Sequence, residues 1–274
     1  MRARELGRRS VVVGDDVAMV GETGGGPDAL ARIVRVADRA SSLRRTADDT
    51  DPVERVVVAN ADILVVVTAL AHPPPRTGLV DRCLVAAYDA RLEPLLCLTK
   101  SDLASPADLV ATYGPLGIPT VVTGRGDGGE GVEALRARLS GRRSVLVGHS
   151  GVGKSTMVND LVPSARRATG AVNAVTGRGR HTSSSAVALP LDDRGGWVID
   201  TPGLRSFGLA HVSSERLLSA FVDLAPGTTA CPSGCSHLAP ECALDAWVAA
   251  GHGTAGRLRS LRHLLASRAA EPDG

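Results

Sequence analysis

A glycine-rich stretch, GHSGVGKS at residues 148–155, carries the clearest chemistry of the sequence and fits the phosphate-binding pattern G-x-x-x-x-G-K-[ST] without deviation. Its glycines let the backbone curl so that successive N–H groups converge on phosphate oxygens. Lys154 would be catalytic by reaching the β- and γ-phosphates, and Ser155 would offer its hydroxyl to Mg²⁺. The expected phosphate-binding residues are Gly148, His149, Ser150, Gly151, Val152, Gly153, Lys154, Ser155 and Thr156.

A second candidate for the same site is the sequence DTPG at residues 200–203, which follows an apolar stretch. A carboxylate at the end of a buried strand can hold the Mg²⁺ shell, so Asp200 is a candidate metal ligand. Gly203 leaves its N–H free to meet the γ-phosphate. Such a turn is common by itself, and its position after a phosphate-binding loop is what favours this interpretation.

The sequence TKSD at residues 99–102 also ends an apolar strand and matches the guanine-reading motif N-K-x-D of GTPases except at its first position. Asp102 would accept hydrogen bonds from the ring N–H and amino group of guanine, and the Lys100 stem would pack over the base. Thr99 belongs to the same site, as do Thr123 and Gly124, which end the next predicted strand. The chain contains only two lysines, and both fall in motifs that use one.

A third set of residues has the types and spacing of a metal site. Cysteines and a histidine form the pattern C-x₃-C-x-H-x₄-C, and three thiolates with one imidazole suit structural zinc. The expected zinc ligands are Cys231, Cys235, His237 and Cys242. Cys83 and Cys97 lie inside a predicted helix and strand and are interpreted as core residues.

Composition excludes several classes of protein. The 274 residues are 43% apolar with a net charge of +2, which excludes a disordered chain and a polycation. Aromatic residues make up 2%, too few for an array of stacked bases. The longest apolar stretch is too short and too polar to span a membrane, and no signal peptide is visible at the N-terminus. We therefore expect a cytoplasmic protein with no membrane partner, acting as a monomer.

The motifs fall on an alternation of apolar strands and helices, which predicts a mostly parallel sheet covered on both faces. The expected strands are 56–68 (one or two strands), 94–99, 120–123, 144–147, 183–191 and 196–200, with helices at 81–90, 107–113, 131–139 and 154–161. Before them lie β-like runs at 11–13 and 31–36 and a polar linker at 44–51. After residue 208 only helices are expected, at 215–224, 243–250 and 255–270.

The order of the motifs is reversed relative to an ordinary GTPase, because the base motif precedes the phosphate-binding loop and DTPG comes last. Circular permutation keeps the sheet while moving the chain ends. With this order, the chain resembles the RsgA (YjeQ) family of bacterial circularly permuted GTPases. The resemblance covers roughly residues 10–265 and depends on TKSD, GHSGVGKST, GRGRHTS at 177–183, DTPGLRSFG at 200–208 and the Cys/His cluster.

The resemblance implies a three-part chain whose GTPase acts in the late assembly of the small (30S) ribosomal subunit, with its rRNA as a partner and activity stimulated by the subunit. The parts would be a partial OB-fold β region at 1–50, a circularly permuted GTPase domain at 51–208 and a zinc-binding helical domain at 209–274. It also implies that Thr182 senses the γ-phosphate and binds Mg²⁺ beside Ser155 and Asp200.

The sequence departs from the family at several positions. Thr99 replaces the usual asparagine, which removes an amide contact near the base, and both outer spacings of the metal cluster are one residue shorter. Only two or three strands fit before Val56, whereas an OB barrel needs about five. We therefore expect an incomplete OB element.

Ras-like enzymes place a water-orienting glutamine just after this motif, but here Leu204 occupies that position and the sequence contains no glutamine. We expect slow hydrolysis by the free protein. One hypothesis gives His181, beside Thr182, this catalytic role when its loop is ordered on the ribosome, and the alternative makes it an rRNA or packing contact. Two other functions remain open: a P-loop ATPase or kinase, and a zinc-containing RNA-binding protein with a vestigial nucleotide site.

Overall fold

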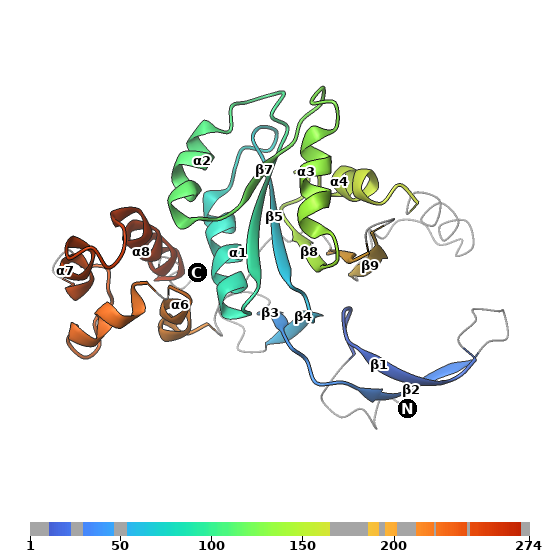
Figure 1. Ribbon diagram of the computed structural model, residues 1–274, viewed down its shortest axis with the longest axis horizontal. Coiled ribbons are helices and arrows are strands. Elements are labelled where there is room, and N and C mark those ends of the chain that lie inside the picture. Colours follow the sequence, from blue (N-terminus) through green and yellow to red (C-terminus); the bar gives the residue numbers. More distant parts are fainter. Residues whose placement is uncertain are drawn as a thin grey trace.

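The computed structural model describes residues 11–22, 30–46, 54–164, 186–191, 195–201, 212–221, 223–239 and 242–269 of the chain. Its centre is a six-stranded sheet in the order β7-β6-β5-β8-β10-β9 (Figure 1). The strands are β5 (Ile63–Ala69), β6 (Glu93–Thr99), β7 (Thr120–Val122), β8 (Arg143–Val147), β9 (Val187–Pro190) and β10 (Trp197–Asp200). All neighbouring pairs are parallel except β9 with β10. The predicted mostly parallel sheet is confirmed.

Helices cover both faces of this sheet, as the continuous apolar strands require. Every residue of β5 is buried, and its side chains alternate between two apolar clusters. Leu64 and Val66 pack in the cluster of α1 (Thr77–Asp89), α2 (Ala107–Tyr113) and the 3₁₀ helix η1 (Gly114–Leu116). Val65 and Val67 pack in the cluster of α3 (Glu130–Leu139) and α4 (Lys154–Leu161).

The N-terminal part forms two antiparallel pairs, β1 (Val17–Gly21) with β2 (Ala31–Val36) and β3 (Ser42–Arg45) with β4 (Arg55–Ala59). Within the described residues these four strands lie in two separate sheets and do not close a barrel. Arg143 of β8 donates to both carboxylate oxygens of Asp16, at 3.0 and 2.8 Å, and so ties this region to the central sheet.

Two predictions for the N-terminal part are wrong. Residues 11–13 form no strand, because the Asp15 carboxylate accepts the N–H of Val12 at 2.8 Å and turns the chain there. The expected polar linker at 44–51 begins inside β3, whose Arg44 and Arg45 pair with β4. The stretch 56–68, for which one or two strands were expected, contributes to two strands, β4 and β5. They are separated at Asn60, which has a positive φ of 54°.

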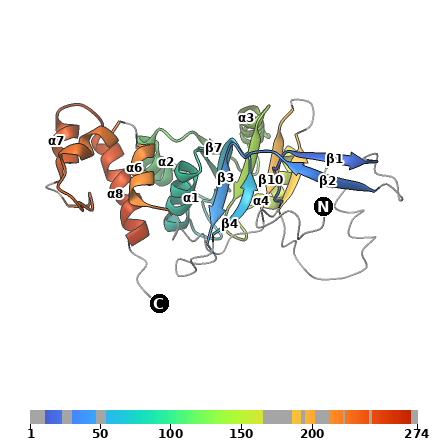
Figure 2. The same ribbon diagram turned by 90° about the horizontal axis from the view of Figure 1, so that it is seen from below.

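The C-terminal part contains α6 (Ser214–Ala220), the 3₁₀ helix η2 (Ala225–Ala230), α7 (Ala243–Ala249) and α8 (Ala255–Ala269). The helix expected at 215–224 is too long, because α6 ends at Ala220. Asp223 lies beyond the end of this helix and pairs with Arg257 of α8. Of these helices α6 and α8 pack on α1, and in both views the group lies at the opposite end of the molecule from β1 and β2 (Figures 1 and 2). Asp89 of α1 pairs with Arg216 at 3.0 Å across this contact.

Among the helices that the structure describes, none combines the length and the apolar character that crossing a bilayer requires.

Asp223→Asn should destabilise the fold in a pH-dependent way. Arg257 donates to both Asp223 oxygens, at 2.6 and 3.1 Å, and this bonding lowers the pKa of Asp223. The contribution of an acid with a lowered pKa is complete above its unfolded pKa and is lost as the pH falls through its folded pKa. At pH 7 the variant should therefore lose about 1 kcal/mol of unfolding free energy. Urea denaturation from pH 7 to pH 3 measures the difference, which should shrink below about pH 4.

Asp160→Asn, at an exposed position in α4, is the matched control and should show no such trend. A difference between Asp223→Asn and the unmodified chain that stays constant across the pH range would contradict the assigned ion pair.

Gly148→Ala should strain the connection between β8 and the loop that follows. A Cβ at this position would lie 2.4 Å from the carbonyl oxygen of Val67 in β5. Overpacking of this kind costs about 1–3 kcal/mol. Gly78→Ala in α1 is the control, because its Cβ meets nothing within 4 Å and alanine favours a helix. Equal denaturation midpoints for the two variants would show that the close approach to Val67 does not make Gly148→Ala destabilising.

Candidate functional site

The loops that carry the predicted motifs lie at one edge of the sheet. TKSD begins at the last residue of β6, the glycine-rich loop follows β8 and Asp200 ends β10, and these strands are parallel members of one sheet. The carboxyl ends of parallel strands share an edge, which is where α/β proteins bind ligands. Three stretches far apart in sequence therefore meet there.

The glycine-rich loop has the backbone that its sequence predicts. Gly151 and Gly153 have φ values of +82° and +95°, a region that favours glycine, and α4 begins at Lys154 directly after them. Val152 is buried, whereas Ser150, Ser155 and Thr156 are exposed at the surface of the site. The Nδ1 atom of His149 lies 2.8 Å from the Ser150 carbonyl oxygen, a contact within the loop.

Lys154 is buried beside the predicted magnesium ligand. Its Nζ lies 2.7 Å from Oδ1 of Asp200 and also donates to the carbonyl oxygen of Thr201. The side chain of Lys154 is 9% exposed and that of Asp200 is 32% exposed. Thr201, which the sequence did not single out, fixes this end of β10 by donating its hydroxyl to the Leu146 carbonyl oxygen at 2.7 Å.

The base motif contacts the glycine-rich loop directly. Nζ of Lys100 donates to the Gly151 carbonyl oxygen at 2.9 Å, and the Thr99 hydroxyl donates to that of Val152 at 2.5 Å. Lys100 also donates to the carbonyl oxygen of His72, a second residue that the sequence did not single out. The reversed order of the motifs along the chain is thus no obstacle to one shared site.

Asp102, Thr123 and Gly124 lie together next to this contact. The N–H of Arg125 donates to Oδ1 of Asp102 at 2.9 Å, and a Cβ on Gly124 would lie 3.2 Å from the same oxygen. The N–H of Ser101 donates to the Thr123 carbonyl oxygen at 3.1 Å. The carboxylate of Asp102 is therefore oriented by backbone at the end of β7.

Asp127 shapes the loop that carries Gly124 and was not found from the sequence. Its carboxylate accepts the N–H groups of Gly129 at 2.8 Å and Gly124 at 3.2 Å, which lowers its pKa. A short acidic residue before two glycines is a common turn signal, and it could have been noticed.

Three predicted site residues, His181, Thr182 and Gly203, lie outside the described residues. The roles assigned to them, and the binding roles of the other site residues, stay predictions.

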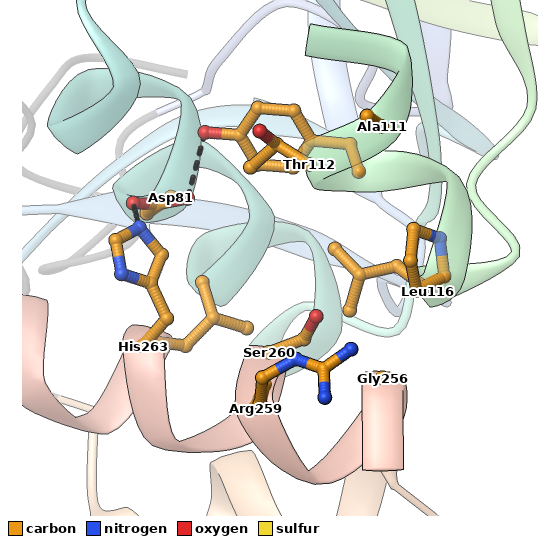
Figure 3. A pocket seen from close by; sticks show the side chains of 11 residues that line it. Asp81, Ala111, Thr112, Leu116, Gly256, Arg259, Ser260 and His263 are labelled. Atoms are coloured by element: carbon orange, nitrogen blue, oxygen red, sulfur yellow. Dashed lines mark hydrogen bonds and ion pairs between the residues drawn. The ribbon is translucent and has the colours of Figure 1, made fainter. Parts of the chain in front are cut away.

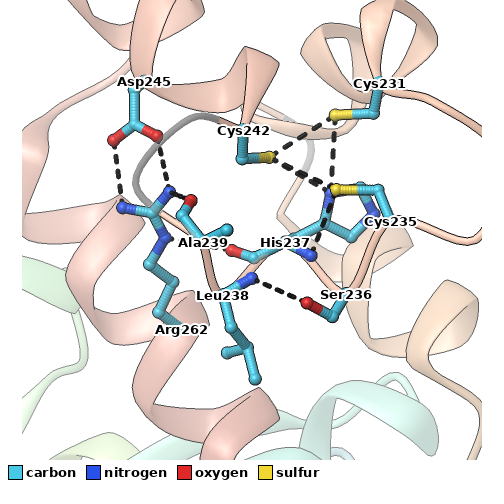
Figure 4. Close-up of polar contacts among 9 residues, drawn as sticks. All are labelled: Cys231, Cys235, Ser236, His237, Leu238, Ala239, Cys242, Asp245 and Arg262. Atoms are coloured by element: carbon cyan, nitrogen blue, oxygen red, sulfur yellow. Dashed lines mark hydrogen bonds and ion pairs between the residues drawn. The ribbon is translucent and has the colours of Figure 1, made fainter.

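The four predicted metal ligands converge in a second site (Figure 4). Their ligand atoms all lie within 4.8 Å of one another. Sγ of Cys242 is 3.4 Å from Sγ of Cys231, 3.9 Å from Sγ of Cys235 and 3.4 Å from Nδ1 of His237. Tetrahedral zinc with thiolates at about 2.3 Å places its donor atoms about 3.8 Å apart. The donor set and its spacing therefore fit a tetrahedral metal ion.

Burial and hydrogen bonding act differently on the thiols of this cluster. Burial raises the pKa of Cys242 to about 11, whereas the N–H of His237 lowers the pKa of Cys235. Arg262 of α8 holds the ligand loop by donating to the carbonyl oxygens of His237 and Ala239 at 3.0 and 2.8 Å, and it pairs with Asp245 (Figure 4). A cation among the thiols would offset the cost of ionising Cys242.

A cavity of about 320 Å³ lies away from both sites, between α2, η1 and α8 (Figure 3). At its floor the buried carboxylate of Asp81 accepts the Tyr113 hydroxyl at 2.9 Å and pairs with His263. Burial raises the pKa of Asp81. These contacts join α1 to α2 and to α8.

Comparison with known proteins agrees with the geometry. The model of the RsgA GTPase family matches residues 36–210. The small ribosomal subunit biogenesis GTPase RsgA of Ectopseudomonas mendocina (strain ymp) is 39% identical over 266 residues, covering 94% of this chain and 75% of that protein. The protein of the same name from Pseudomonas syringae pv. syringae (strain B728a) is 37% identical over 250 residues, covering 88% and 71%.

Two solved structures have a similar fold. The crystal structure of YjeQ from Thermotoga maritima has a TM-score of 0.66 and 27% identity, covering 98% of this chain and 88% of that one. YloQ, described as a circularly permuted GTPase, has a TM-score of 0.64 and 22% identity, covering 98% and 84%. The arrangement of the motifs, the family match and the relatives agree: this chain belongs to the RsgA GTPase family and has the fold of a circularly permuted GTPase.

Proposed function

We propose that this chain hydrolyses GTP to GDP and phosphate as a late-acting factor in the biogenesis of the small ribosomal subunit, and that the subunit stimulates the reaction. The main support for a nucleotide site is the pair of hydrogen bonds that Thr99 and Lys100 donate to the glycine-rich loop. They support the proposal because they hold TKSD against the glycine-rich loop, so that one ligand could contact both. The names of the relatives, small ribosomal subunit biogenesis GTPases, support the ribosomal partner.

In this proposal Asp102 selects the base. Its exposed carboxylate would accept two N–H groups of guanine, an arrangement that adenine does not offer. Lys100 would cover the base with its stem while its ammonium holds the carbonyl oxygens of Gly151 and His72. Thr123 and Gly124 would line the same end of the site through their backbone. Because adenine cannot donate this pair of hydrogen bonds, a carboxylate at Asp102 disfavours an ATPase.

The phosphate end would use the N–H groups of residues 148–156 and the charge of Lys154. When nucleotide binds, the Lys154 ammonium would be shared between Asp200 and the phosphate oxygens. Ser155, Asp200 and Thr182 offer hydroxyl and carboxylate oxygens, the donors that Mg²⁺ prefers. Bound Mg²⁺ would supply positive charge to the phosphate oxygens. Gly203 would add its N–H at the γ-phosphate.

The chain by itself should hydrolyse GTP slowly, since Leu204 stands where a water-orienting glutamine would be. His181 is proposed to orient the water when its loop is ordered on the subunit and its rRNA. Catalysis of phosphoryl transfer depends mainly on positioning and charge. Stimulation by a partner that orders the loop is consistent with that requirement.

We further propose that residues 51–208 form the GTPase domain, that 1–50 form a partial OB-like element and that 209–274 form a helical domain with one structural zinc. Cys231, Cys235, His237 and Cys242 would hold the ion. The protein is proposed to act as a monomer in the cytoplasm.

Lys154→Ala should abolish subunit-stimulated turnover. Loss of a charge that stabilises the transition state should lower the rate by about 100-fold or more. GTP turnover is measured with and without small ribosomal subunits for the unmodified chain, for this variant and for Arg138→Ala. Arg138 is exposed on α3, and its replacement should leave the rate unchanged. If the subunits fail to stimulate the unmodified chain, the proposed partner is wrong.

The purified chain should contain one zinc ion, and Cys242→Ser should remove it. The loss should also lower the free energy of unfolding by several kcal/mol, because metal binding supplies folding energy. Zinc content by atomic absorption and urea denaturation test this. Cys83→Ala is the control, since this buried cysteine is outside the cluster and its variant should keep the metal. A zinc-free chain of unchanged stability would contradict a structural site.

A further inference from the structure

Thr99 makes a contact that differs from the one expected at its position. Its side chain is buried, with 4% of the residue exposed, and its hydroxyl donates to the Val152 carbonyl oxygen at 2.5 Å. Within the described part of the chain, the second acceptor near this hydroxyl is the Thr68 carbonyl oxygen, at the longer distance of 3.4 Å. A threonine hydroxyl has a single proton to donate. That proton is therefore committed to the glycine-rich loop.

The contact also orients the next amide of the loop. In a trans peptide the C=O and the following N–H lie in one plane and point in opposite directions. Because the Val152 carbonyl points at Thr99, the N–H of Gly153 points away from it. Gly153 is the N-cap residue of α4, and such N–H groups at the start of a helix are the ones that bind phosphate.

Neighbouring contacts make this arrangement stiff. The three atoms nearest to a Cβ placed on Gly153 all belong to the side chain of Thr99, at 3.7 to 4.0 Å. Lys100 holds the preceding carbonyl, that of Gly151, at 2.9 Å. Two consecutive carbonyls of the loop are thus held from the end of β6, which limits rotation of the peptide between them.

We propose that Thr99 is a positioning residue for the phosphate site, which aims the Gly153 amide at the nucleotide phosphates and takes no part in choosing the base. The proposal depends on the nucleotide site proposed above. It separates the two halves of TKSD: Thr99 serves the phosphates, and Asp102 serves the base. The asparagine that is usual at this position has an amide with two donor hydrogens, so it could serve both.

The test is a cycle of variants measured by equilibrium binding of GDP and xanthosine diphosphate (XDP). Thr99→Val keeps the shape and removes the hydroxyl, and Thr99→Ser keeps the hydroxyl. Asp102→Asn should exchange guanine for xanthine, whose carbonyl at position 2 accepts from the new amide. The Asn oxygen can still accept the N–H of Arg125.

Thr99→Val should weaken GDP binding about tenfold, the effect of leaving a buried carbonyl without its donor. Thr99→Ser should bind GDP as the unmodified chain does. In the Asp102→Asn background, Thr99→Val should weaken XDP binding by the same factor. Denaturation of each variant without nucleotide shows whether it is folded, and Thr99→Ser restores the hydroxyl if the valine variant is not.

Three results would overturn the proposal. They are unchanged GDP binding by Thr99→Val, equal weakening by Thr99→Ser, and an XDP affinity in the Asp102→Asn background that the valine leaves untouched. The last result would mean that Thr99 acts through the 2-amino group of guanine, the group at which xanthine differs from it. Failure of the proposed function is distinguishable, because the unmodified chain would then show no preference for GDP over ADP. The effect of the valine would in that case be measured with ADP.

Discussion

The candidate nucleotide site depends on two carbonyl oxygens, those of Gly151 and Val152, being held by side chains from the end of another strand. A glycine-rich loop is intrinsically flexible, because glycine samples both signs of φ. Bonds from Lys100 and Thr99 remove much of that freedom before any ligand arrives. The same bonds fix the distance between the part of the site suited to a base and the part suited to phosphates.

This constraint explains why the reversed order of motifs is compatible with a GTPase. The contacts join the end of β6 to the loop after β8, with β5 between them in the sheet. None of these contacts depends on which strand comes first in the chain. A parallel sheet gathers the carboxyl ends of its strands at one edge whatever their order, so the position of the chain ends is free to change.

Features with a local cause were predictable. The helices at 107–113 and 154–161 match α2 and α4 at both ends, and the loop conformation follows from its glycines. The four residues of the metal cluster lie close together in the sequence, so their spacing alone was enough to predict that they would meet. Features that depend on distant partners were missed: β3 forms only because β4 pairs with it, and residues 11–13 turn because of Asp15. The hydrogen bond from Arg262 to the loop that carries the metal ligands was likewise missed, because nothing in the sequence near that loop indicates it.

The two lysines of this chain have a consequence for its covalent chemistry. Both ammonium groups are bonded to backbone carbonyls, Lys100 at the glycine-rich loop and Lys154 at Thr201, and Lys154 is largely buried. Any reagent or enzyme that acylates lysine side chains in this chain can act only at these two groups. Acetylation would remove the positive charge there and leave one N–H donor in place of three. Every lysine acylation of this chain would therefore alter the candidate nucleotide site. Amine-directed labelling at these two side chains, as distinct from the α-amino group, would report on the accessibility of the candidate nucleotide site.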